Sequence, residues 1–362
     1  MTEHITTTDY SYFDGDSSSF ICEMSSVKEL LKICGPIALS IIFIFGFVGN
    51  ILVVVTFSCY KRSKTMTDIF LLNMAIADML FIFTLPFWAV YYQKDEWIFQ
   101  GFMCKLLRSI YAINFSCSML LLACVGIDRY VAIVQVTKSF RLRNIALSHK
   151  GVLCLTVWIV AACLSSITYI FSESYKPENS PVMVCEARFP EHLSASKWKF
   201  AIIAVEICVG FFIPFIVMLF CYACIIKTLL KAKNSQRHKA IQVIVTVVIV
   251  FLLCQVPYNL ALLVKAINLV GHNEECTERK NIEYALNFTK LLAFFHCCLN
   301  PVIYAFIGVK FRNYFVKVMQ NMCFMHKFAL SRTRGSRVCS DTYTSRRTSE
   351  VFPSEGGSSF TV

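Results

Sequence analysis

The sequence predicts an all-α membrane protein, a bundle of seven transmembrane helices. Three observations predict this fold: an apolar composition, seven long apolar runs, and basic residues concentrated in alternate connections between those runs. Of the 362 residues, 56% are hydrophobic and 16% are charged, whereas a soluble chain is typically about a quarter charged. The mean hydropathy is +0.59. This composition excludes an ordinary soluble domain.

Seven runs are long enough to cross a bilayer, which takes about 20 apolar residues in a helix. Lipid offers no partners for backbone N–H and C=O groups, so these runs are expected to be helical. The predicted spans are residues 33–60, 69–93, 109–127, 151–172, 200–226, 240–264 and 284–309. Within them only Asp78, Glu206 and Lys290 carry charge.

The basic residues predict the orientation of the bundle. Lys and Arg are concentrated after the first, third, fifth and seventh spans, whereas the other connections are mixed or acidic. Because cytoplasmic loops carry the excess of Lys and Arg, we expect the N-terminus outside and the C-terminus in the cytosol. The formal net charge of +12 would suggest a nucleic-acid partner, but the distribution of the basic residues argues against one.

The chain is expected to divide into four parts. These are an acidic extracellular tail at 1–32, the bundle at 33–309, a membrane-surface helix at 310–325 and a disordered, phosphorylatable cytoplasmic tail at 326–362. Phe311, Phe315 and Val318 recur at helical spacing between basic residues, which is typical of an interfacial amphipathic helix. This segment would be a short eighth helix.

Asp128-Arg129-Tyr130 follows the uncharged third span. Charge at membrane depth is costly and is usually functional. In a signalling protein, such an Arg is held by the neighbouring Asp in one state and released toward a partner protein in another. The alternative is an Arg that reaches the lipid headgroups without a switching role. The predicted topology places the triplet at the cytoplasmic end of the third span and favours the switch.

Prolines predict kinks in four spans. In Asn300-Pro301-x-x-Tyr304 of the seventh span, Pro301 removes a backbone donor and bends the helix. Asn300 is expected either to satisfy a freed carbonyl or to pair with another intramembrane polar group. The second, fifth and sixth spans carry Pro86, Pro214 and Pro257. These kinks are either tolerated prolines or hinges for motion of the cytoplasmic ends.

Five polar side chains lie at membrane depth: Asn50, Asp78, Asn114, Ser118 and Asn300. An intramembrane Asp indicates a functional site by default. We expect one hydrogen-bonded cluster, with a sodium ion as its candidate ligand. The alternative is helix–helix hydrogen bonding without an ion.

Four cysteines lie outside the spans on the predicted extracellular side: Cys22, Cys104, Cys185 and Cys276. Disulfides form in such an oxidising space, and four cysteines allow three pairings. We find no metal-ligand spacing, nucleophile constellation or phosphate loop, so an enzyme is not expected. His296 is a lone histidine in the seventh span and is expected to pack rather than to bind a ligand. The two halves show no internal repeat, which weakens a transporter reading.

Several motifs together resemble a class A (rhodopsin-like) G-protein-coupled receptor over about residues 30–325. They are Gly49-Asn50-Ile51-Leu52-Val53, Asp78 with the seven residues before it, Asp128-Arg129-Tyr130, Trp158, Pro214, Pro257 and Asn300-Pro301-x-x-Tyr304. Within that class, further features are similar to the chemokine receptors. They are Thr84-Leu85-Pro86-Phe87-Trp88-Ala89, the extension Val131-Ala132-Ile133-Val134 and the pair Cys22 and Cys276.

The resemblance implies the partners and the disulfides. The ligand would be a C-C chemokine, the intracellular partner a heterotrimeric G protein of the inhibitory class, and the regulators arrestin and receptor kinases. The location would be the plasma membrane, and the response calcium mobilisation and leukocyte chemotaxis. The implied disulfides are Cys104–Cys185 and Cys22–Cys276. No cofactor is implied apart from the candidate sodium ion.

The resemblance also implies three sets of functional residues. In the tail, acidic residues beside tyrosines invite sulfation and would attract a basic ligand: Asp9, Tyr10, Tyr12, Asp14 and Asp16. Ligand-lining residues of the bundle would be Trp88, Tyr111, Glu206, Tyr258 and Lys290. The switch residues would be Asp128, Arg129, Tyr130, Asn300, Pro301 and Tyr304.

Two positions depart from the family pattern. Lys290 stands where many chemokine receptors carry Glu, so it is expected either to bind an acidic group of the ligand or to pair with Glu206. Gln255 stands where most class A receptors carry Trp. An atypical receptor that scavenges chemokines without G-protein signalling is the alternative function, and the intact Asp128-Arg129-Tyr130 argues against it.

Overall fold

The computed structural model describes residues 25–60, 65–135, 144–177, 181–188, 195–231, 235–268 and 276–307, with the single positions 316 and 320. The chain divides into two compact units, Met1–Tyr314 and Phe315–Val362, and everything below concerns the first. Of the predicted eighth helix, only positions 316 and 320 are described, and both are helical. Residues 25–32 of the predicted extracellular tail belong to the first helix, and the rest of the two tails lies outside the described residues. Those predictions therefore remain untested.

Helices dominate the described residues. The elements are α1 Ser25–Val55, the π-helix η1 Thr56–Tyr60, α2 Met66–Ile82, α3 Leu85–Lys94, α4 Gln100–Ile133, α6 Lys150–Phe171, strands β1 Ser172–Tyr175 and β2 Val184–Ala187, α7 Ala195–Val205, the π-helix η2 Glu206–Phe212, α8 Ile213–Lys231, α9 Ser235–Asn268 and α10 Cys276–Ile307. Seven segments of the described chain are long and apolar enough to cross a membrane. The predicted seven-span bundle is thereby confirmed.

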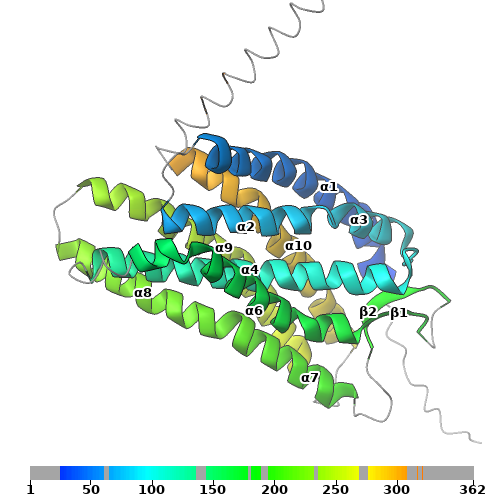
Figure 1. Ribbon diagram of the computed structural model, residues 1–362. Helices are drawn as coiled ribbons and strands as arrows, with labels where there is room; N and C mark the ends of the chain where they lie inside the picture. Colours follow the sequence, from blue (N-terminus) through cyan, green and yellow to red (C-terminus); the bar gives the residue numbers. More distant parts are fainter. Residues whose placement is uncertain are drawn as a thin grey trace, which may run out of the picture. The chain divides into compact units, whose positions relative to one another are not determined.

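Helix α4 is the centre of the bundle (Figure 1). It packs against α2, α6 and α8, and its first turns contact the β1–β2 hairpin. Of its most apolar 18-residue window, 67% is buried, against 22% for α6 at the periphery. Because α4 carries both Tyr111 and Arg129, it connects the two ends of the bundle through a single continuous helix.

At two of the predicted proline kinks, Pro86 and Pro214, the helix is interrupted or rewound rather than simply bent. The second span is interrupted: α2 ends at Ile82, and α3 starts at Leu85 with Pro86 in its first turn. The Thr84 hydroxyl donates to the Phe81 carbonyl oxygen (2.7 Å) at this break. In the fifth span, the π-helical turn η2 ends just before Pro214, and such turns often occur at functional sites.

The third proline feature joins α1 to α10. Pro301 has no N–H, so it leaves the Cys297 carbonyl without its intrahelical donor. The Asn50 side chain of α1 donates to that carbonyl oxygen at 2.9 Å. The helices meet closely there, because a Cβ added to Gly49 would lie 2.9 Å from the Pro301 ring. Of the two roles expected for Asn300, the structure shows the second: Asn300 pairs with Asp78, and Asn50 satisfies the freed carbonyl.

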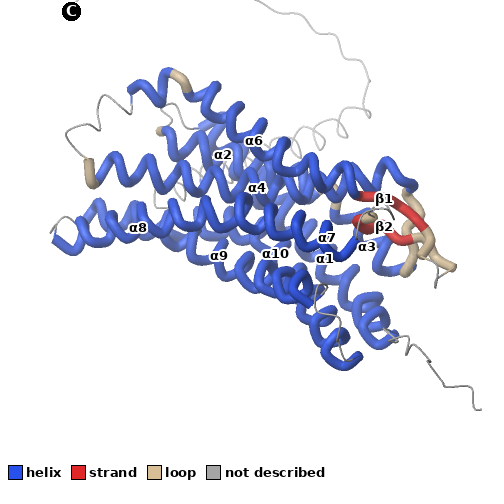
Figure 2. Tube along the Cα trace, turned by 90° about the horizontal axis from the view of Figure 1, so that it is seen from below, coloured by secondary structure: helices blue, strands red, loops and turns tan. Residues whose placement is uncertain are grey.

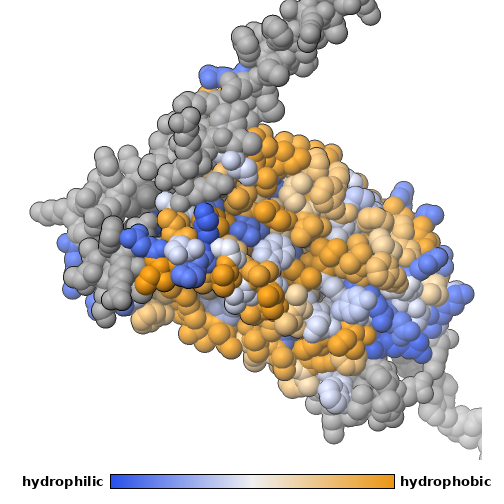
Figure 3. All heavy atoms as spheres, viewed as in Figure 1, coloured by the Kyte–Doolittle hydropathy of each residue, from blue (hydrophilic) through white to orange (hydrophobic). Residues whose placement is uncertain are grey.

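The bundle presents an apolar surface between two hydrophilic ends, as Figure 3 shows for one face. Large side chains on its outside include Phe45, Leu219 and Phe288, which are 66%, 60% and 73% exposed. Such a surface would be an aggregation hazard in water. In a membrane protein it is the surface that faces lipid.

Candidate functional sites

The β1–β2 hairpin lies at one end of the bundle (Figure 2). Because a disulfide attaches this hairpin to α4, we call this end the disulfide end. The strands pair antiparallel, with Ser174 opposite Cys185. Cys185 is bonded to Cys104 of α4, with a Cα–Cα distance of 5.6 Å, which confirms the predicted pairing. Cys22 lies outside the described residues, so its pairing with Cys276 remains a prediction.

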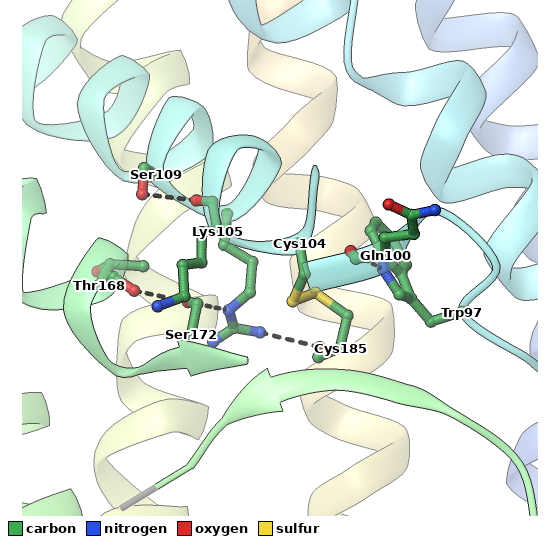
Figure 4. Close-up of a disulfide and its surroundings, with 9 residues drawn as sticks. Trp97, Gln100, Cys104, Lys105, Ser109, Thr168, Ser172 and Cys185 are labelled. Atoms are coloured by element: carbon green, nitrogen blue, oxygen red, sulfur yellow. Dashed lines mark hydrogen bonds between the residues drawn. A yellow bond between two sulfur atoms is a disulfide. The ribbon is translucent and has the colours of Figure 1, made fainter. Parts of the chain in front are cut away.

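Arg108 fixes the hairpin beside the Cys104–Cys185 disulfide, whose surroundings are drawn in Figure 4. Its Nε donates to the Ser172 hydroxyl at 2.9 Å, and its Nη1 reaches the Cys185 carbonyl oxygen at 3.5 Å. Trp97 anchors the start of α4 by donating to the Gln100 carbonyl oxygen (2.8 Å). At the hairpin's edge, burial and then the nearby Glu186 carboxylate raise the pKa of the Tyr175 phenol, so this side chain stays neutral at physiological pH.

Beneath the hairpin, four predicted ligand-lining residues gather around an aromatic cluster. The Tyr111 ring of α4 lies 6.4 Å from the Tyr258 ring of α9 and 5.1 Å from the Phe294 ring of α10. The Lys290 Nζ lies 5.2 Å from the Trp88 ring of α3 and 5.7 Å from the Phe294 ring. The cluster holds the ammonium of Lys290 by cation–π contact.

Glu206 lies in η2, close enough to Tyr111 and Tyr258 for its carboxylate to act on both phenols. It also lines a small pocket with Ser116 of α4, Thr168 of α6 and Gly210. Among the described residues no ion pair joins Glu206 to Lys290, so that predicted alternative is wrong. Lys290 therefore offers a positive charge without a carboxylate ion-pair partner in the described chain. The tail residues predicted to bind ligand lie outside that part of the chain.

The bundle interior holds a polar core around Asp78, which is fully buried. Asn114 of α4 donates to Asp78 Oδ1 at 2.9 Å, and Asn300 of α10 donates to Oδ2 at 3.0 Å. The Cys297 Sγ lies 3.5 Å from Oδ1, and the His296 Nε2 lies 3.7 Å from the same oxygen. The carboxylate thus ties α2 to α4 and α10.

The predicted cluster is correct for three of its five members. Asn50 is hydrogen-bonded to the Gly46 and Cys297 carbonyl oxygens instead. Ser118 is buried, and its hydroxyl has no hydrogen bond within the described chain. The sequence-based reading missed His296 and Cys297, which lie four and three residues before Asn300. Helical spacing places both on the Asn300 face, a signal that was available.

The opposite end of α4 carries the predicted switch residues Asp128, Arg129 and Tyr130, and we call it the Arg129 end. Counting about 1.5 Å per residue, Arg129 lies roughly 38 Å along the helix from Cys104. The Arg129 Nη2 contacts Asp128 Oδ2 at 2.6 Å, and these side chains are 19% and 8% exposed. Thr67 of α2 donates its hydroxyl to the same carboxylate oxygen at 2.8 Å. The sequence-based reading did not find Thr67.

The remaining switch residues are placed in part. The Tyr130 ring packs against the Phe220 ring of α8, with centroids 5.7 Å apart. Asn300 and Pro301 belong to the polar core and the α1–α10 joint. The side chain of Tyr304 lies outside the described part of α10. Because the Arg129 guanidinium contacts the Asp128 carboxylate, the structure shows the state in which Asp128 holds Arg129.

Comparison with known proteins places this geometry in a family. Residues 49–304 match the 7 transmembrane receptor (rhodopsin family). The chain is 48% identical to C-C chemokine receptor type 6 of Homo sapiens, over 97% of this chain and 94% of that receptor. It is 41% identical to C-C chemokine receptor type 9 of Homo sapiens, over 86% and 84%, and 37% identical to atypical chemokine receptor 4 of Homo sapiens, over 86% and 88%.

The similarity to the type 6 receptor is also visible in the sequence. Four segments of this chain carry the sequence-based resemblance to that receptor: 135–143, 234–241, 296–299 and 358–362. The family consists of receptors rather than enzymes, and its members are multi-pass proteins of the plasma membrane. This chain belongs to the chemokine receptors of the rhodopsin family of seven-transmembrane receptors.

Proposed function

We propose that the protein binds a C-C chemokine outside the cell and activates a heterotrimeric G protein of the inhibitory class, which leads to calcium mobilisation and leukocyte chemotaxis. The observation that carries this proposal is the clasp of Arg129 by Asp128 and Thr67. A charged pair held by a hydroxyl from another helix is a two-state element that a ligand can bias. Similarity to the type 6 receptor supports the liver- and activation-regulated chemokine as the ligand.

The orientation follows from the charge of the connections. With the N-terminus outside, the disulfide end faces the extracellular space and the Arg129 end faces the cytosol. The acidic tail, with Asp9, Asp14 and Asp16 beside Tyr10 and Tyr12, would then meet the ligand first. Chemokines are basic, so the opposite charges raise the association rate.

The ligand's own N-terminal segment would then enter the aromatic cluster. The Lys290 ammonium would leave the Trp88 ring and pair with a carboxylate of the ligand. Trp88 supplies a second recognition element, because its buried indole N–H donates to no acceptor in the described chain. A buried donor left unpaired costs about 1–3 kcal/mol. A ligand acceptor would recover that cost.

At the cytosolic face, ligand binding would favour the state in which Arg129 leaves Asp128. Arg129 Nε is buried and has no hydrogen bond in the described structure, so the present state does not use all its donors. A G protein would accept the released guanidinium. Receptor kinases and arrestin would act on the Ser- and Thr-rich tail at 326–362, and the segment 310–325 would lie on the membrane as an eighth helix.

A scavenging receptor without G-protein signalling is the second candidate, because atypical chemokine receptor 4 is among the similar proteins. The experiment exposes cells that express the chain to a panel of chemokines and measures calcium flux and migration with and without pertussis toxin. A toxin-sensitive response to one C-C chemokine is expected. Robust chemokine uptake with neither response would overturn the signalling function and leave the scavenger.

A further inference from the structure

The polar core contains three different metal-binding atoms that face one another. They are the carboxylate of Asp78 on α2 and the imidazole and thiol of the neighbouring His296 and Cys297 on α10, all within 4.8 Å. All three side chains are almost completely buried, with exposures of 0%, 1% and 0%. Together they form what we call the Asp–His–Cys trio.

The separations in the trio match three corners of a zinc tetrahedron. Zinc binds Cys sulfur at about 2.3 Å and His nitrogen or carboxylate oxygen at about 2.0–2.2 Å, so neighbouring ligand atoms lie about 3.3–3.6 Å apart. The His296 Nε2 lies 3.5 Å from the Cys297 Sγ. Asp78 Oδ1 lies 3.5 Å from that sulfur and 3.7 Å from that nitrogen. Only small shifts would be needed to bring these three atoms into a zinc coordination shell.

The donor set of the trio favours a softer cation than the candidate sodium ion. Hard cations select oxygen ligands, whereas imidazole and thiolate select zinc and related transition metals. Around Asp78, the amides of Asn114 and Asn300 present N–H groups to the carboxylate. These amides donate to the carboxylate, and the Asn114 Oδ1 and the Ser118 hydroxyl have no hydrogen bond in the described chain. The trio adds one nitrogen and one sulfur.

The surroundings of the trio suit a metal ligand set. The His296 Nδ1 contacts the Ala293 carbonyl oxygen and also, at 3.1 Å, the side-chain nitrogen of Gln255. In the tautomer that donates from Nδ1 to the carbonyl, the Nε2 lone pair faces Asp78. Metal-binding histidines typically donate their second N–H in this way. With a carboxylate and a thiolate, a divalent cation gives a site with no net charge, as a low-dielectric interior requires.

We propose that the Asp–His–Cys trio binds a zinc ion or a similar soft divalent transition metal in the centre of the bundle. Binding would release the Cys297 thiol proton to solvent and form one metal–sulfur, one metal–nitrogen and one metal–oxygen bond, with water at the fourth corner. The metal bridges α2 and α10 one turn before Pro301. It therefore stabilises the present arrangement of α10 and opposes signalling.

The test uses the full-length receptor, purified in lipid nanodiscs, stripped with a chelator and titrated with zinc chloride. Zinc content is measured by mass spectrometry, and the zinc K-edge absorption spectrum reports the ligands. We expect one zinc per receptor beyond that bound by the Cys297→Ser variant, with one sulfur ligand at about 2.3 Å. Cys297→Ser and His296→Gln should weaken this binding by at least about 100-fold, since losing even an outer-shell partner costs 10–100-fold.

Cys298→Ser is the matched control. Cys298 is the next residue and is equally buried, but its Sγ donates to the Ile42 carbonyl oxygen (3.3 Å), away from the trio. This variant keeps every other cysteine and histidine of the chain, so it should bind zinc like the unaltered receptor. Equal zinc binding by Cys297→Ser and the unaltered receptor would overturn the proposal. If the trio variants do not fold, a wild-type spectrum without sulfur overturns it on its own.

Discussion

The two ends of helix α4 are held by different kinds of bond. At the disulfide end, a covalent bond between Cys104 and Cys185, the guanidinium of Arg108 and a β-hairpin fix the surface around the aromatic cluster. At the Arg129 end, one ion pair and one hydroxyl hold the central arginine. In the proposed function, the first end keeps its shape while a ligand docks. The second changes state at a cost of a few kcal/mol, which is the scale of a ligand's differential binding energy.

Arg129→Ala should have the largest effect, because it removes the switching charge. We expect G-protein activation and calcium mobilisation to be abolished at normal surface expression. Chemokine affinity in membranes without G protein should change by less than about threefold, since coupling between the two ends is reciprocal only when both partners are present. A wild-type calcium response would show that the Arg129 end does not carry the signal.

Cys104→Ser tests the covalent end. Loss of a native disulfide typically costs about 2–5 kcal/mol, so we expect a lower thermal unfolding midpoint and much reduced chemokine binding and surface expression. Cys163→Ser is the control, because Cys163 is an exposed free cysteine. If Cys104→Ser bound chemokine as well as Cys163→Ser, the rigidity of this end would be irrelevant to the ligand.

Lys290→Glu probes recognition at the disulfide end without opening it. Reversing the charge beside Trp88 should shift agonist potency by about tenfold, equivalent to about 1.4 kcal/mol, while surface expression stays near normal. Lys290→Arg keeps the cation and should shift potency much less. The measurement is a calcium dose–response curve, and unchanged potency of Lys290→Glu at normal expression would contradict the assigned role.

Thr67→Val should have the smallest effect and the opposite sign. Removing the hydroxyl that holds Asp128 weakens the clasp by about 1 kcal/mol and should raise basal G-protein activity about fivefold. Thr56→Val is a matched control, because Thr56 is also buried and its hydroxyl has no hydrogen bond in the described structure. Nucleotide exchange without agonist measures both. Equal basal activity in the two variants would remove Thr67 from the switch.

Apolar runs and spacing predicted the spans, because membrane helices are determined by local composition. The Cys104–Cys185 pairing came from family resemblance, and the structure confirms it. The break at Ile82 and the π-helical turn before Pro214 were missed, because a proline predicts a disturbance and not its form.

The side-chain partners were harder to predict than the spans. Asn50 and Cys297 are far apart in the sequence and meet only because α1 packs on α10 at Gly49. Thr67 and Asp128 likewise come together through the packing of α2 on α4. His296 was taken as a packed residue although its spacing placed it on the Asn300 face; that its ring meets Asp78 depends on how α10 packs on α2. Such contacts depend on helix rotation, which hydropathy leaves undetermined.

The hydrogen bond from Asn50 to the Cys297 carbonyl oxygen offers a way to observe movement of α10 near Pro301. Pro301 has no amide proton, so deuterium exchange at the backbone cannot report the opening of this joint. The informative protons are the two on the Asn50 side-chain nitrogen. An isotope label on that one amide would turn α1 into a spectroscopic reporter of the movement of α10.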